Sequence, residues 1–333
     1  MKTDLAIIGH GAVTPVGVGI DAFLSATPKP QMTATLGEPK VEVPVLRVDL
    51  KDPSFARWQK EPRLRRASPM TFFMIESAEQ ALRGMATDDR AQTGLVVALS
   101  AGCLVYSRRF FEGILRNGQR TASPALFPET VFNSPGSHVA SVLGLNGAVD
   151  ALCGDESAWI SALKTAAIWL RRGRVQQVLV MGVEEFDPLV LDAYRSARWL
   201  RQPGFLTSEG AAALLVRTAG PGDQLVIARV HEGLPYRTRA EAAFAAVELF
   251  NGIDATIPCY RTARNTWMER LERETTEGRP EFSSAPPPHL GSAFTASIAW
   301  ETIRAAAALD APRGLVPVWG LNHRVGYLEL ERR

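Results

Sequence analysis

The stretch Gly147-Ala-Val-Asp-Ala-Leu-Cys-Gly-Asp-Glu156-Ser-Ala-Trp-Ile-Ser-Ala-Leu163 decides the fold of this chain. The residues up to Cys153 are typical of a strand, and those from Ser157 onward have the spacing of a helix. The turn between them is sharp, and such strand-to-helix turns often present a catalytic side chain. The helix is predicted to end at Gly173, and a buried strand is expected at Val178–Val183.

The predicted helix has an ordinary core face, on which Ile160, Leu163, Ala167 and Leu170 share one stripe with Glu156. Asp155 and Glu156 also have the position of first-turn acids, which stabilise a helix N-terminus. Two interpretations of Glu156 therefore stay open. It is either the floor of a pocket or a solvated acid that caps the helix.

Composition limits the class of protein. The chain has 333 residues, of which 46% are hydrophobic and 22% charged, so it can bury a large core. The formal charge of +2 does not indicate a nucleic-acid partner. Cys103, Cys153 and Cys259 have no metal-ligand or CxxC spacing, so we expect no metal and no cofactor. We find no apolar run long enough for a bilayer and no signal-type start, and we expect a cytoplasmic protein that does not enter the membrane.

Apolar runs and helical patterns alternate along the chain, which predicts layered sheets covered by helices. Residues 29–60 are rich in Pro, Lys and Glu and indicate a surface excursion, and 277–288 indicate a proline-rich loop. The predicted strands are Leu5–Ile8, Gly94–Leu99, Val178–Met181, Ala211–Val216 and Leu225–Val230. The predicted helices are Ser68–Met85, Ser137–Leu143, Ser157–Leu170, Arg237–Leu249, Thr262–Glu274 and Ser292–Leu309.

Several segments resemble the β-ketoacyl synthase family, strongly in the first half of the chain and less in the second. They are Leu5-Ala-Ile-Ile-Gly-His-Gly-Ala-Val-Thr-Pro-Val-Gly17, Ala122-Ser-Pro-Ala-Leu-Phe-Pro128, Asn133-Ser-Pro-Gly-Ser-His-Val-Ala140, Val180-Met-Gly-Val-Glu184, Phe205-Leu-Thr-Ser-Glu-Gly-Ala211 and Tyr327-Leu-Glu-Leu-Glu-Arg-Arg333. The resemblance implies an α/β, thiolase-like fold of two similar halves in α-β-α-β-α layers. We expect residues 1–217 to form the first half and 218–333 a shortened second half, together one compact domain.

The family's catalytic positions are replaced in this chain. The family carries a nucleophilic cysteine at the elbow, and counts from Gly144-Leu-x-Gly147 and back from Leu170-Arg-Arg-Gly173 both place Glu156 there. Asn251 falls near one family histidine, Ser283 near the lysine and Pro288 near the second histidine, with His289 displaced by one residue. A carboxylate is a poor acyl acceptor, so the resemblance implies that the condensation machinery is gone.

The resemblance then implies a chain-length factor, the cysteine-free subunit that pairs with an active ketosynthase in type II polyketide or aryl polyene-type systems. Its partners would be that ketosynthase, as a heterodimer, and an acidic acyl carrier protein with a phosphopantetheine-bound acyl chain. Basic residues are candidates for steering the carrier, and bulky residues for limiting chain length at the end of the acyl tunnel. The basic candidates are Arg63, Arg65, Arg66, Arg108, Arg109, Arg116 and Arg120, and the bulky ones are Phe110, Phe111, Phe127, Phe132 and Trp159.

Two alternatives remain at this point. A stand-alone acyltransferase or malonyl-carrier decarboxylase would use Cys153 or Glu156, with Asp155 and His289 in the pocket. A scaffold homodimer would have no tunnel. A buried structural Cys153 is the more ordinary interpretation, because free cysteines are commonly small core residues.

Overall fold

The structure is a computed structural model, which describes residues 1–24, 32–36, 41–201, 205–282, 290–321 and 324–333. The strands are β1 (Lys2–Thr14), β2 (Gly17–Val18), β3 (Met32–Leu36), β4 (Val41–Leu46), β5 (Thr93–Leu99), β6 (Val149–Cys153), β7 (Gln177–Glu184), β8 (Thr207–Ser208), β9 (Gly210–Thr218), β10 (Leu225–Pro235), β11 (Arg313–Trp319) and β12 (Arg324–Arg332). The α-helices are α1 (Ile20–Leu24), α2 (Ala56–Gln59), α3 (Pro69–Ala81), α4 (Thr87–Ala91), α5 (Leu104–Asn117), α6 (Ser134–Leu143), α7 (Ala158–Arg171), α8 (Pro188–Ser196), α9 (Arg239–Phe250), α10 (Thr266–Thr275) and α11 (Phe294–Ala308). Short 3₁₀ turns are η1 (Pro53–Phe55), η2 (Pro62–Leu64), η3 (Gln119–Thr121), η4 (Phe127–Thr130) and η5 (Trp199–Arg201).

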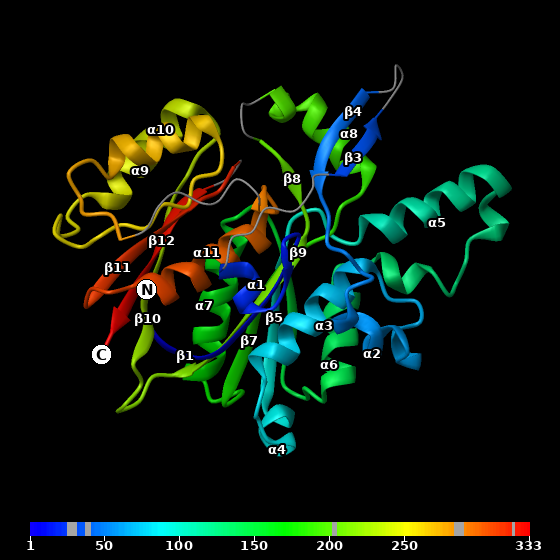
Figure 1. The fold of residues 1–333 in the computed structure, drawn as a ribbon, viewed down its shortest axis with the longest axis horizontal. Helices are drawn as coiled ribbons and strands as arrows, with labels where there is room; N and C mark the ends of the chain where they lie inside the picture. The colour runs from blue at the N-terminus through cyan, green and yellow to red at the C-terminus, as the bar shows by residue number, and fades with distance from the viewer. Residues whose placement is uncertain (25–31, 37–40, 202–204, 283–289, 322–323) are drawn as a thin grey trace.

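One large mixed sheet organises the molecule (Figure 1). Its strand order is β11-β12-β10-β1-β9-β7-β5-β6, with β2 paired to β1. Strand β5 runs parallel to both β6 and β7, whereas the β1–β10 and β10–β12 pairs are antiparallel. Strand β6 lies at one end of the order, so one of its edges has no neighbour within this sheet.

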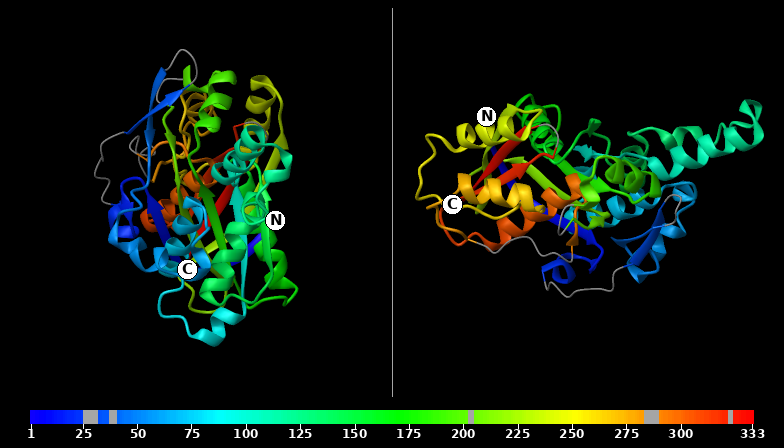
Figure 2. Two further views of the ribbon diagram at one scale, coloured as in Figure 1. Left: turned by 90° about the vertical axis from the view of Figure 1, so that its right-hand side faces the viewer. Right: turned by 90° about the horizontal axis from the view of Figure 1, so that it is seen from above.

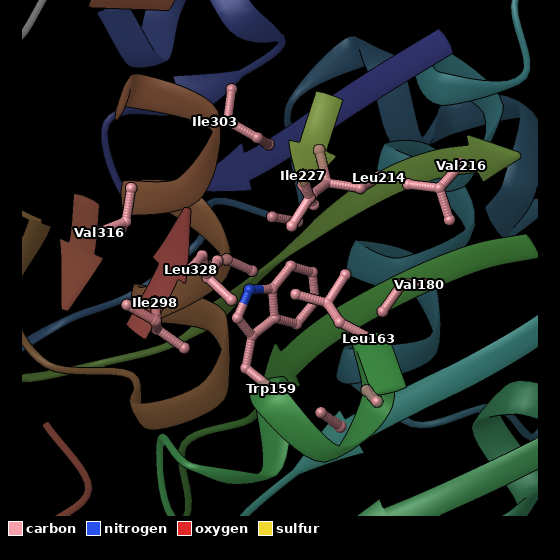
Figure 3. Packing of buried hydrophobic residues seen from close by; sticks show 14 of the residues in the cluster. Trp159, Leu163, Val180, Leu214, Val216, Ile227, Ile298, Ile303, Val316 and Leu328 are labelled. Carbon is pink, nitrogen blue, oxygen red and sulfur yellow. The ribbon is translucent and has the colours of Figure 1, made fainter. Parts of the chain in front are cut away.

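The hydrophobic clusters show five layers. Helices α7 and α11 lie in the middle, in one cluster with residues of both β5–β9 and β10–β12. Helices α3 and α6 cover the outer face of the first group of strands, and α9 and α10 cover the outer face of the second. Figure 3 shows Trp159 of α7 among core side chains from both groups of strands. The sheet closes around the central helices because each face of each group of strands is apolar.

This arrangement confirms the predicted α/β, thiolase-like fold class. The second group of strands is the smaller one and consists of β10, β11 and β12. The division of the chain at residues 217 and 218 stays a prediction.

The prediction that residues 29–60 form a surface excursion is wrong for the described part of this segment. Within the described part, β3 and β4 pair with each other, and β4 pairs with β8 in a second, three-stranded sheet. Val45 of this sheet is buried in a cluster with Phe186, Leu191 and Phe294. The prediction was wrong because it gave more weight to the Pro, Lys and Glu content than to the alternating apolar residues of Met32-Thr-Ala-Thr-Leu36 and Val41-Glu-Val-Pro-Val45.

Helix α5 was not predicted, and it projects away from the rest of the molecule (Figure 2). We call the segment Leu104–Thr130, which holds α5, η3 and η4, the arm. The arm exposes large apolar side chains to an unusual degree: Phe111 is 60% exposed, Leu115 84% and Phe127 56%. None of the described helices is both long enough and apolar enough to cross a membrane.

Candidate functional site

The elbow has the predicted strand-to-helix geometry. Strand β6 ends at Cys153, and the amide of Gly154 still donates to the carbonyl of Leu99 at 3.0 Å. The turn is closed by Asp155, whose Oδ1 accepts from the amide of Ser157 at 2.9 Å and from its hydroxyl at 2.6 Å. Asp155 therefore closes the turn that leads into α7, whose N-cap residue is Ser157.

Glu156 makes a longer-range contact than Asp155. Its Oε2 accepts a hydrogen bond from the amide of Leu321 at 3.1 Å, so the elbow is tied to the loop between β11 and β12. Burial, and next the charge of Asp155, raise the pKa of Glu156 to about 8. The interpretation of Glu156 as a solvated acid is wrong, because its carboxyl faces an enclosed cavity.

The cavity beside Glu156 is polar and has a volume of about 20 Å³, enough for a single water molecule. Arg264 donates to Glu301 and to the carbonyl of Gly291, while its buried Nε has no hydrogen-bond partner among the described residues. Burial lowers the pKa of Arg264, and the carboxylate of Glu301 opposes that shift. The cavity is lined by Glu156, Phe205, Thr262, Ala263, Arg264, Asn265, Met268, Ser292, Ser297, Ile298, Glu301, Trp319 and Leu321.

A much larger apolar groove lies on the other side of the elbow. Its volume is about 800 Å³, and Asp155 is at its polar end. Tyr194 forms its aromatic wall, with its ring centroid 5.2 Å from that of Trp199 and 5.6 Å from that of Phe294. The lining is Ser100, Ala101, Leu104, Asp155, Leu189, Val190, Ala193, Tyr194, Ala197, Trp199 and Phe294.

Three further buried glutamates lie at the end of β7 and between β8 and β9, and the sequence analysis did not single them out. Glu184 accepts from the amides of Ser100 at 2.5 Å and Ala101 at 3.1 Å, and Glu185 accepts from that of Val105 at 3.1 Å. Burial raises the pKa of both to about 8. Glu209 accepts from the amides of Val48 and Phe186 and pairs with Arg47. These carboxyls accept hydrogen bonds from backbone amides in loops, where no neighbouring strand provides an acceptor. The sequence signal for them was the acidic cluster Glu184-Glu-Phe-Asp187 after a buried strand.

Cys153 is exposed at the end of β6, so its interpretation as a buried core residue is wrong. Its thiol donates to the carbonyl of Ser100 at 3.3 Å. Burial of the sulfur, and next the charge of Glu184, raise the pKa of the Cys153 thiol. A raised pKa lowers the thiolate fraction that would attack an acyl group.

The bulky residues predicted at a tunnel end line neither the groove nor the cavity. Trp159 is fully buried in the core, where its Nε1 donates to the hydroxyl of Thr302 at 3.0 Å. Phe110 lies in the arm with its ring centroid 5.5 Å from Phe111 and 5.7 Å from Phe127. Phe132 is 47% exposed at the base of the arm. Their role at the end of an acyl tunnel stays a prediction.

The positions compared with the family's other catalytic groups are only partly described. Asn251 is exposed at the end of α9 and does not line the cavity beside Glu156. Thr262–Asn265 line it instead, and the side chain of Asn265 accepts from the amide of Met268 as the N-cap of α10. An Asn before an amphipathic helix was the signal that would have found this segment. Ser283, Pro288 and His289 lie outside the described residues.

The predicted docking arginines do not form one free patch. Arg108 pairs with Asp187 at 2.9 Å and with Glu112 at 3.0 Å, and Arg116 pairs with Glu112 at 3.6 Å. The other arginines remain candidates. Arg63 pairs with Glu61, Arg109 lies over the ring of Tyr106, and Arg65, Arg66 and Arg120 are exposed. The described residues contain no group of three or more His, Cys, Asp or Glu side chains placed to hold a metal ion.

Comparison with known proteins now assigns the family. Residues 27–220, more than half of the chain, match the model of the β-ketoacyl synthase N-terminal domain. The chain therefore belongs to the β-ketoacyl synthase family. No curated protein matches it by sequence.

Solved structures show the same fold over the whole chain. The ishigamide ketosynthase/chain length factor has a TM-score of 0.81 at 19% identity, with 99% of each chain covered. A type II polyketide synthase acyl-carrier protein in complex with its ketosynthase bound to the hexaketide gives 0.75 at 15% identity, with both chains fully (100%) covered. A β-ketoacyl synthase from Burkholderia phymatum gives 0.75 at 16% identity, also with 100% of each chain covered.

Proposed function

We propose that this chain is a non-catalytic, chain-length-factor-like subunit that pairs with an active β-ketoacyl synthase and shapes the acyl tunnel. The observation that carries the proposal is Glu156. A carboxyl stands at the end of the elbow, tied to the amide of Leu321 beside a cavity with room for one water molecule. An acyl-transfer site needs an activated nucleophile and space for the tetrahedral intermediate. The elbow supplies neither, and Cys153 has a raised thiol pKa.

The arm supports pairing with a second subunit. Monomeric proteins rarely expose several large apolar side chains together, and such patches commonly mark interaction sites. Here Phe111 and Leu115 are exposed on α5, which projects away from the rest of the molecule (Figure 2), and Phe127 is exposed on η4. Edge strand β6 lies near the arm, because α6 contacts both η4 and β6. We propose that the ketosynthase partner binds this face. The phenylalanines of the arm would then contribute to the tunnel of that partner.

The apolar groove supports an acyl ligand. Its volume of about 800 Å³ and its lining from α8, Trp199 and Phe294 suit a long hydrocarbon chain. Asp155 stands at the end nearest the elbow. The proposal places the growing chain in this groove, with the length of the product limited by the groove's side chains.

The same proposal treats residues 1–217 and 218–333 as two unequal halves of one domain, because β9 ends at Thr218 and β10 begins a new group of strands. We propose the cytoplasm as its location, consistent with three unpaired cysteines.

Co-expression with a tagged active ketosynthase and its carrier protein tests the proposal. We expect the two subunits to co-purify, and the Phe111→Ser/Leu115→Ser variant to lose the partner without losing its fold. The matched control is Phe244→Ser/Val247→Ser on α9, whose side chains are 61% and 57% exposed. In the paired enzyme, Ala193→Phe in the groove should shorten the product, whereas Ala240→Phe on the exposed face of α9 should not.

If Ala193→Phe leaves the product length unchanged, the proposed acyl tunnel is contradicted. If the subunits do not co-purify, the proposed pairing is contradicted. A stable homodimer that binds no ketosynthase would favour the scaffold alternative.

A further inference from the structure

The segment between β7 and α8 holds the first two turns of α5, the helix with which the arm begins. The side chain of Glu185 accepts a hydrogen bond from the amide of Val105 at 3.1 Å. Two residues further on, Asp187 accepts from Nε of Arg108 through both carboxylate oxygens, at 3.0 and 2.9 Å. Only 1% of Asp187 is exposed, so protein groups rather than bulk water stabilise its charge. The base of the arm is therefore fixed to the body of the molecule by an ion pair whose carboxylate is buried.

The same carboxylate also begins α8. As the N-cap residue of α8, Asp187 accepts from the amide of Leu189 at 3.0 Å. Helix α8 provides four of the residues that line the apolar groove, and α5 provides Leu104. Leu104 and Arg108 are four residues apart, so they lie on the same side of α5. Asp187 is thus bonded to two of the helices that line the groove, and its contacts set how these two walls lie relative to each other.

Arg108 also links the groove to the outer part of the arm. Its guanidinium donates to Glu112 at 3.0 Å, one turn further along α5. Phe111 and Leu115, the exposed apolar residues of α5, lie on these same outer turns. Without Arg108, the carboxylate of Asp187 would lose its cation while water is still excluded, which is unfavourable unless the helices move to expose it. The position of α8 therefore depends on how α5 is held.

We propose that Arg108 is a positioning residue that ties the shape of the apolar groove to the position of the arm. A partner bound to Phe111 and Leu115 would fix α5, and through Arg108 and Asp187 it would fix the wall of the groove that α8 forms. By thermodynamic reciprocity, a ligand in the groove favours binding at the arm by the same factor. This inference rests on the proposed function for the identity of the partner and of the acyl ligand. It gives Arg108 a role different from carrier docking, for which the sequence made it a candidate.

Titration of the purified chain with Nile red, a neutral apolar dye, followed by fluorescence, tests the role of Arg108 without a partner. The Ala193→Phe variant fills the groove and shows how much of the signal comes from it. We expect Arg108→Ala to weaken the groove-dependent binding about fivefold or more, from the lower limit typical of coupled sites, and Arg108→Lys, which keeps the charge, to retain most of it. Asp187→Asn, which keeps an acceptor for Leu189, should cause the same loss. The double variant should bind no more weakly than either single variant, because both remove the same ion pair.

The matched control is Arg109→Ala, which removes the neighbouring arginine that lies over the ring of Tyr106. Its dye binding should equal that of the wild type, and circular dichroism checks the fold of every variant. Hydrogen exchange gives a second measurement. Saturating Nile red should slow amide exchange in residues 104–117 of the wild type, but not in Arg108→Ala or in Ala193→Phe. Exchange in α9 should stay unchanged in all three proteins.

Wild-type dye binding by Arg108→Ala, additive losses in the double variant, or equal slowing of exchange with and without Arg108 would overturn the inference. So would a wild type whose dye binding is unaffected by Ala193→Phe, because the groove would then hold no apolar ligand. The measurements need neither a partner nor a product. A chain that shows the expected dye effects but does not co-purify with a ketosynthase would therefore refute the proposed function alone.

Discussion

At the scale of single residues, the two carboxyl groups of the elbow make separate contacts. Asp155 caps the turn, and Glu156 holds Leu321 from a largely enclosed position. Folding favours the neutral form of Glu156, because its pKa rises to about 8 in the folded state. The same shift to about 8 in Glu184 and Glu185 makes the elbow a region where ionisation opposes folding.

The first prediction concerns pH. A carboxyl whose pKa is raised in the folded state stabilises fully below its unfolded pKa, and that contribution is lost as the pH rises towards about 8. Between these limits the free energy of unfolding falls by up to about 1.4 kcal/mol per pH unit for each such group. We expect Glu156→Gln, which keeps an acceptor for Leu321, to flatten this decline when urea unfolding is measured from pH 5 to about 9.

The control for this prediction is Glu248→Gln, which changes an exposed glutamate on α9. Its stability curve should run parallel to that of the wild type. Parallel curves for wild type and Glu156→Gln would show that Glu156 is ionised in the folded chain across this range.

At the scale of elements, glycine sets how closely α3 packs on β1. A Cβ on Gly9 would meet the carbonyl oxygen of Ala81 at 2.1 Å, and one on Gly11 would meet that of Ser77 at 2.0 Å. Two backbones in direct contact leave no room for a side chain. Gly9 and Gly11 are thus required where α3 packs directly on β1.

The second prediction uses this contact. Gly9→Ala or Gly11→Ala should destabilise the chain by about 1–3 kcal/mol, because backbone must move to admit the methyl group. Gly113→Ala in the projecting helix α5 is the matched control, since a Cβ there meets nothing within 4 Å. The control should stabilise by up to about 1 kcal/mol through helix propensity, as measured by thermal and urea unfolding. The same loss in all three variants would contradict the packing argument.

At the scale of the whole molecule, one sheet and two central helices hold both groups of strands together. Trp159 packs with side chains of both groups and donates to Thr302 of α11 (Figure 3). It therefore links layers that come from distant parts of the chain.

The third prediction follows from that position. Trp159→Ala should cost about 3–5 kcal/mol, the range for truncating a buried aromatic residue. Trp159→Phe should cost less, because most of the core remains filled, and Trp267→Ala, at a half-buried site on α10, should cost least. Urea unfolding of the three variants gives the order, and a Trp159→Ala variant as stable as Trp267→Ala would contradict the central role of Trp159.

Much of the fold was predictable because buried strands have continuous apolar runs. The runs at 94–99, 178–181 and 211–216 became β5, β7 and β9, and the helical spacing after Ser157 became α7. Strands β3 and β4 were missed although their apolar residues alternate, because proline and charged residues surround them and β4 pairs with β8 from elsewhere in the chain. Helix α5 has an amphipathic pattern that the sequence analysis did not use. Asn251 was compared with a family histidine, yet Thr262–Asn265 line the cavity. Spacing along the sequence does not measure distance across a fold.

The sequence by itself determined the class of fold and the strand-to-helix elbow with its two acids, since each depends on local pattern and residue identity. Tertiary structure alone decided that Glu156 accepts a hydrogen bond from Leu321, that Arg264 lines the same cavity and that Arg239 lies over the ring of Trp267. The physical reason is that strand and helix patterns arise from neighbours within a few residues. A site arises where segments far apart in the chain are buried against one another.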